Sequence, residues 1–74
     1  MNTLVEYWYR APGSTQDEEL ETQTIDRDPE DALKLVHSPG DTVPLESGRY
    51  RVVAVQPRPT EGVENLIRVF VTDA

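Results

Sequence analysis

The alternation of apolar and polar residues toward the C-terminus predicts two β-strands. Residues 49–56 and 65–72 are dominated by β-branched and aromatic side chains, which favour the half-buried surface of a sheet. Residues 57–64 between them contain two prolines and Gly62, so this connection cannot continue either strand and must turn. We therefore predict an antiparallel hairpin over residues 49–72, against which the rest of the chain packs.

The two faces of this hairpin differ in polarity. One face is all apolar, and we expect a helix to cover it; its residues are Tyr50, Val52, Ala54, Ile67, Val69 and Val71. The other face carries the mixed set Arg51, Val53, Arg68 and Phe70. This set is too apolar for an ordinary solvated surface, unless the N-terminal strand curls round into a small barrel and covers part of it.

The N-terminal half predicts one clear strand and one weak one. Residues 3–9 are rich in strand formers, with Val5, Tyr7 and Tyr9 on one face and Leu4, Glu6, Trp8 and Arg10 on the other. Residues 20–25 are compatible with an edge strand paired to the first as a meander. Their pattern is weak, because Leu20 and Ile25 lie on opposite faces of a regular strand.

The segment Asp28-Pro29-Glu30-Asp31 predicts the start of a helix. Asp28 is suited to cap the free amides, proline is preorganised for the first helical position, and the two acids complement the positive end of the dipole. The helix should run from residue 29 to about 37. We expect its inward stripe to be Ala32, Leu33 and Val36, with Leu35 at the margin; Ser38-Pro39-Gly40 ends it, and Pro44 keeps the following residues extended.

These elements predict one α+β domain over residues 1–74, built from a small antiparallel sheet of three to four strands and one short helix. A chain of this size buries about 60% of its unfolded surface, so its stability should be modest. It has no cysteine, no secretory signal pattern and no stretch long enough to span a membrane. We therefore expect a monomer in the cytoplasm.

The charge distribution argues against direct nucleic-acid binding. The formal net charge is -7, with 14 acidic and 7 basic residues, and the acids concentrate between residues 17 and 31. We name five of them as a candidate acidic surface: Glu18, Glu19, Glu21, Asp26 and Glu30. Residues 26–31 lack the alternating ligands and central glycine of a calcium loop, so helix capping and solvation explain them better, and we expect no metal.

The sequence contains no recognisable catalytic set, and we expect neither enzymatic activity nor a cofactor. It has no nucleophile elbow, no glycine-rich phosphate loop and a single histidine, His37, which falls where a cation stabilises the helix end. Arginine and aromatic residues are instead enriched at protein contacts. The candidate contact residues are Tyr7, Trp8, Arg10, Arg49, Arg51, Val53, Arg68 and Phe70. Core packing of the aromatics, and pairing of arginines with carboxylates such as Glu6, are alternative roles.

The whole chain, which begins Met1-Asn2-Thr3-Leu4-Val5-Glu6-Tyr7-Trp8-Tyr9-Arg10, resembles the small phage-encoded transcription regulators that bind bacterial RNA polymerase, in particular those of phages infecting Xanthomonas. The resemblance implies a protein that binds the N-terminal part of the polymerase β′ subunit near the RNA exit region. It also implies inhibition of host initiation, by displacement of the promoter-specificity factor, together with antitermination.

Two other classes of function remain open from the residues alone. One is an acidic nucleic-acid mimic, whose carboxylates imitate phosphates in the channel of a host enzyme or defence complex; its affinity should collapse with salt. The other is a structural or assembly protein of a virion, which should oligomerise with concentration.

Overall fold

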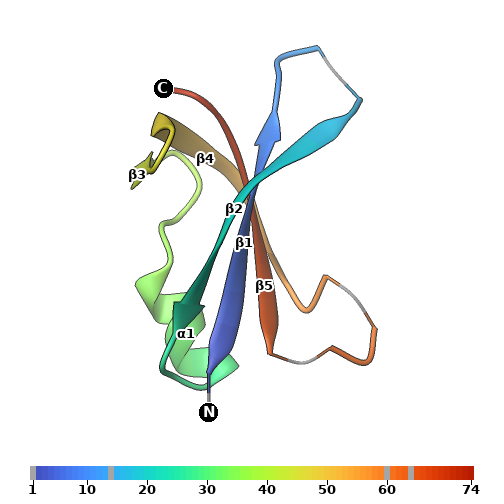
Figure 1. Ribbon diagram of the computed structural model, residues 1–74, viewed down its shortest axis with the longest axis vertical. Coiled ribbons are helices and arrows are strands. Elements are labelled where there is room, and N and C mark those ends of the chain that lie inside the picture. The colour runs from blue at the N-terminus through green and yellow to red at the C-terminus, as the bar shows by residue number, and fades with distance from the viewer. Residues whose placement is uncertain (1, 14, 60, 64) are drawn as a thin grey trace.

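Five strands and one short helix form the fold in the computed structural model, which describes residues 2–13, 15–59, 61–63 and 65–74 (Figure 1). In chain order the elements are β1 (Thr3–Arg10), β2 (Asp17–Ile25), α1 (Pro29–Leu35), β3 (Thr42–Leu45), β4 (Gly48–Pro57) and β5 (Leu66–Asp73). The predicted α+β class is confirmed. The sheet has more strands than the three to four expected.

The strand order is β2-β1-β5-β4-β3, which places β5 in the centre of the sheet. The predicted hairpin is confirmed, because β4 and β5 pair antiparallel. The predicted meander is also confirmed, since β1 pairs antiparallel with β2. The expectation of a purely antiparallel sheet is wrong, because β1 runs parallel to β5, with Val5 opposite Ile67 and Tyr7 opposite Val69.

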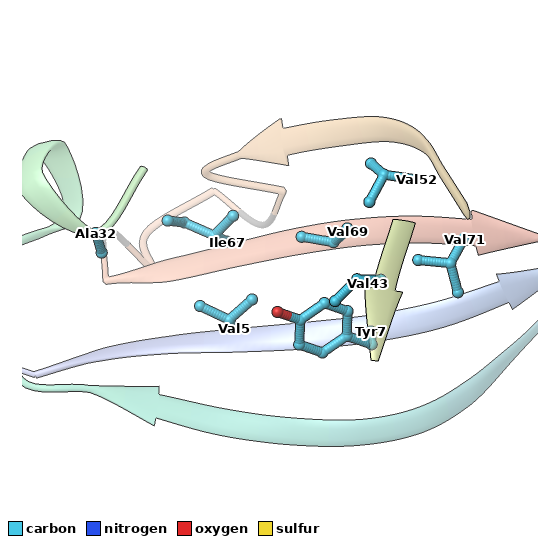
Figure 2. Packing of buried hydrophobic residues seen from close by; sticks show 8 residues of the cluster. All are labelled: Val5, Tyr7, Ala32, Val43, Val52, Ile67, Val69 and Val71. Carbon is cyan, nitrogen blue, oxygen red and sulfur yellow. The ribbon is translucent and has the colours of Figure 1, made fainter. Parts of the chain in front are cut away.

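The core lies on one face of this sheet, which curls around it. Figure 2 shows the buried cluster, made of Val5, Tyr7, Ala32, Val43, Val52, Ile67, Val69 and Val71. Ala32 of α1 lies at one end of the cluster, and β3 contributes Val43 to it (Figure 2). The backbone N–H of Glu46, beside β3, donates a 2.9 Å hydrogen bond to Glu21 Oε1 on β2. This bond links the turn after β3 to the β2 side chain of Glu21 across the apolar face, so the curl covers that face and leaves the mixed face outside.

A β-bulge in β4 corrects the predicted face assignment of the hairpin. Val52 lies opposite Val71 and Ala54 opposite Phe70, so Val53 is the extra residue. Val52 is fully buried as expected, but Ala54 moves to the mixed face and Val55 packs against the core in its place. The sequence pattern assumes that successive side chains alternate strictly between the two faces, so it cannot reveal a bulge.

A second bulge explains why the pattern of residues 20–25 was weak. Tyr7 lies opposite Glu21 and Trp8 opposite Glu19, so Leu20 has no partner in the register. The extra residue brings Leu20 to the same side as Ile25, and both pack against the core. The strand is nine residues long and forms one edge of the sheet.

The helix is shorter than predicted and buries a narrower stripe. It ends at Leu35, and Val36 is already extended, so His37 lies beyond the helix and is exposed. Asp28 occupies the N-cap position without a side-chain capping hydrogen bond; its carbonyl accepts from the Ala32 N–H at 2.8 Å. Ala32 is buried and Val36 packs on the core, but Leu33 is 38% exposed and is therefore not an inward residue.

Residues 42–45, expected as an extended linker, form the short edge strand β3. Pro44 is tolerated there because an edge strand has one side without ladder hydrogen bonds. Among the described residues, no helix is long and apolar enough to cross a membrane.

Core packing predicts a clear contrast between two leucine-sized side chains. Ile67 is 1% exposed in the central strand, whereas Leu35 is 61% exposed at the end of α1. Ile67→Ala should lower the free energy of unfolding by about 2–5 kcal/mol, because it leaves a cavity in the core. Leu35→Ala should change it by less than about 0.5 kcal/mol. Urea denaturation of both variants measures the difference. Equal losses of unfolding free energy would contradict the burial of Ile67 in the core and the exposure of Leu35.

Candidate interaction surface

The outer face of the sheet, hereafter the mixed face, brings together side chains from three adjacent strands. Neighbours across β1 and β5 are Glu6 with Arg68 and Trp8 with Phe70. On β4, Ala54 lies opposite Phe70 and Gln56 opposite Arg68. The mixed face consists of Leu4, Glu6, Trp8, Arg10, Arg49, Arg51, Val53, Ala54, Gln56, Leu66, Arg68, Phe70 and Thr72.

Glu6 is the centre of a hydrogen-bonded group on this face. Its Oε1 accepts from Arg68 Nε and Nη2, both at 3.1 Å, and from Trp8 Nε1 at 3.2 Å. The Arg68 guanidinium carbon also lies 5.0 Å from the centroid of the Trp8 ring, which is a cation–π contact. The parallel pairing of β1 with β5 therefore holds Arg68 and Trp8 in one geometry.

A second group lies at the other end of β1. The Arg10 guanidinium carbon stands 4.3 Å above the centroid of the Phe70 ring. The same guanidinium donates to Asp17 through Nε at 2.9 Å and through Nη2 at 3.2 Å, a bidentate geometry. These hydrogen bonds lower the pKa of Asp17 and raise that of Arg10. Asp17 thus fixes Arg10 as a cover over Phe70.

Two predicted contact residues are not on the accessible surface. Tyr7 is 5% exposed and belongs to the core, where burial and the charge of Glu21 raise its pKa. Phe70 lies on the mixed face but is also only 5% exposed, with Arg10 above its ring. The alternation pattern placed both side chains on the right faces, but it could not show that Phe70 is covered.

The other predicted contact residues lie at or near the surface. Trp8 and Arg68 are partly exposed, and Arg10, Arg49, Arg51 and Val53 are exposed. No side-chain hydrogen bond or ion pair joins the guanidinium of Arg49 or Arg51 to another described residue. These two arginines therefore present their charge to solvent, whereas Arg68 and Arg10 are engaged within the chain.

A shallow hollow of about 350 Å³ opens on the mixed face at the C-terminal end of β1. It is lined by Arg10, Ala11, Pro12, Gly13, Val53 and Thr72. Thr72 Oγ1 is buried there without a hydrogen-bond partner among the residues that the structure describes. Sequence reasoning did not identify Asp17, Pro12 or Thr72. For Asp17 the available signal was a charge opposite to that of Arg10, but residue 17 lies outside the strand expected at residues 20–25.

The five acidic candidates do not form one cluster. Glu18, Glu19 and Glu21 lie on β2, Asp26 follows that strand, and Glu30 lies in the first turn of α1. Glu21 is tied to the Glu46 N–H and to Gln23 Nε2 at 2.8 Å. Within the described ranges, no three His, Cys, Asp or Glu residues are arranged to hold a metal ion.

No known protein-family model, curated protein sequence or solved structure matches this chain.

The Arg10–Asp17 pair predicts a defined dependence of stability on pH. A carboxyl group whose pKa is lower in the folded state contributes stability above its unfolded pKa of about 3.9 and loses it as the pH falls through the folded pKa. The difference in unfolding free energy between wild type and Asp17→Asn should shrink as the pH falls from about 5 to about 2. Urea denaturation over this pH range checks it.

As a direct control, Arg10→Gln should raise the titration midpoint of Asp17, because it removes the group that lowers the pKa. Carboxyl-detected NMR follows this midpoint in both proteins. An unchanged midpoint would show that Arg10 does not hold Asp17 in solution.

Proposed function

We propose that this protein is a binding module that acts by occupying a surface of bacterial RNA polymerase with its mixed face. The partner region is the N-terminal part of the β′ subunit near the RNA exit region. Occupancy there inhibits host initiation by displacing the promoter-specificity factor, and it promotes antitermination during elongation. In this role it is a phage protein that works as a monomer in the host bacterial cytoplasm and transforms no substrate.

The observation that carries the binding role is a sheet face with arginine and aromatic side chains that no described element covers. Trp8 and Arg68 are held by Glu6, and Arg10 is held by Asp17, so these groups need little ordering when a partner binds. Tryptophan and arginine are enriched among residues that dominate binding energy. Exposed Arg49, Arg51 and Val53 extend the face toward β3.

The size of the face fits this role. The molecule measures 34 × 23 × 19 Å, so its broadest side covers roughly 800 Å², the area that each partner contributes to an interface of standard size. A protein of 74 residues reaches that area only by using one whole face. The choice of polymerase as the partner is supported by the resemblance of the whole chain to phage-encoded polymerase-binding regulators.

Charge reversal at the two solvent-facing arginines tests the proposed face. Arg49→Glu combined with Arg51→Glu should weaken binding to purified bacterial RNA polymerase at least about tenfold, because two cations of the contact become anions. Biolayer interferometry with the holoenzyme and with an isolated β′ N-terminal fragment measures the affinity. An accompanying transcription assay should show less inhibition of initiation.

The matched control is Arg27→Glu combined with Lys34→Glu, which makes the same charge change beside and on α1, away from the mixed face. This variant should retain affinity within about threefold, a margin within the usual context dependence of surface charges. Equal losses in both variants would point to net charge alone. No binding of the wild-type protein to the polymerase would refute the choice of partner.

The nucleic-acid mimic predicts the opposite pattern. Neutralising Glu18, Glu19, Glu21, Asp26 and Glu30 should then abolish binding, and the affinity should fall steeply with salt. An interface centred on Trp8 and its neighbours should weaken only moderately between low and physiological salt. Titrations at two salt concentrations distinguish the two.

A further inference from the structure

The outer edge of β2 is a second surface, distinct in chemistry from the mixed face. This strand is nine residues long and ends the sheet, so one side of its backbone has no neighbouring strand among the described residues. The other edge strand, β3, has four residues and contains Pro44, which removes a backbone donor. Within the part of the chain that the structure describes, β2 therefore offers the longer row of main-chain donors and acceptors at an edge.

The regular part of this strand is Glu21–Ile25. It pairs with β1 without interruption, from Tyr7 opposite Glu21 to Thr3 opposite Ile25, whereas the bulge at Leu20 twists the strand before it. Thr22, Gln23 and Thr24 are all exposed. An added strand of about five residues is thus the length that this edge accepts.

The acidic charge of β2 disfavours a second copy of this strand as partner and favours a basic one. Asp17 and Glu19 lie on the same side of the sheet as Arg10 and Trp8 and border the mixed face, while Glu18 and Glu21 lie on the other side, opposite Tyr9 and Tyr7. β2 contains no basic residue. A second copy pairing along this edge would add a strand that also carries four carboxylates and no basic residue, so charge does not favour self-association there. A cationic strand meets carboxylates on both faces.

We propose that the outer edge of β2 binds an extended, basic protein segment by β-sheet extension. Backbone hydrogen bonds to Glu21–Ile25 supply the pairing, and lysine or arginine side chains at the end of the segment beside residues 17–19 supply the orientation. Because the carboxylates alternate between faces, consecutive basic residues fit this end better than alternate ones. The backbone edge that pairs lies outside the mixed face, although Asp17 and Glu19 border that face, and the proposal does not rest on polymerase being the partner.

Synthetic peptides and the full-length protein test this directly. The probe has four lysines followed by Thr-Val-Thr-Val-Thr, with blocked ends, and a second probe has the reverse order, since an added strand runs in one of two directions. Amide hydrogen exchange of the ¹⁵N-labelled protein should slow at alternate positions within β2 with one of the probes. Absence of slowing with both probes at millimolar concentration would refute the proposal.

A backbone-modified peptide separates strand pairing from charge attraction. N-methylation of all the Thr and Val residues keeps the lysines but removes the donors needed for pairing. The methylated peptide should bind at least about tenfold more weakly, which corresponds to about 1.4 kcal/mol. Equal affinity would show that the acidic strand attracts cations without pairing and would overturn the inference.

Charge substitutions on the protein provide the final comparison. Glu18→Lys with Glu19→Lys should lower the affinity for the lysine probe about tenfold, because both side chains are exposed beside the expected cations. The control, Asp26→Lys with Glu30→Lys, has the same net charge but alters acids outside β2. It should retain most of the affinity. Equal losses in both variants would contradict a site on the β2 edge.

Discussion

The burial of β5 between β1 and β4 is the constraint on which the rest of this structure depends. Val69 and Val71 are fully buried. Val69 lies between Tyr7 and Val55, and Val71 lies between Tyr9 and Val52. A central strand must be paired along both edges, because unpaired buried backbone groups cost several kcal/mol. The C-terminal hairpin satisfies one edge. The N-terminal strand satisfies the other in a parallel arrangement, which requires a crossover, and the chain makes it through β2, α1 and β3.

The same arrangement produces both the enclosed core and the open face. The sheet curls so that β3 and α1 cover the apolar side, and the Glu46–Glu21 hydrogen bond links the turn after β3 to β2. No described element remains to cover the other side (Figure 1). On that side Arg10 lies above the Phe70 ring and is paired with Asp17, while Arg68 lies above the Trp8 ring and is paired with Glu6. An organised surface of this kind serves recognition better than a uniformly charged one.

The two β-bulges show how single residues alter which side chains are available for function. At Val53 the bulge exchanges Ala54 for Val55 in the core and directs Val53 toward the hollow beside Arg10 and Thr72. At Leu20 the bulge brings an apolar side chain under the sheet and leaves the acids of β2 around the edge. Bulges at edges and next to binding sites are common because they re-aim side chains without loss of the strand.

The amino-acid pattern by itself determined the α+β class, the C-terminal hairpin, the start of the helix at Pro29 and the split of Val5 and Tyr7 from Trp8 and Arg10. These properties follow from local propensity and from the alternation of side chains along a strand. The parallel pairing of β1 with β5, the bulges, the strand β3 and the cover of Arg10 over Phe70 were decided only by tertiary structure. Each depends on which distant segments become neighbours, and side-chain alternation within a segment carries no information about its neighbours.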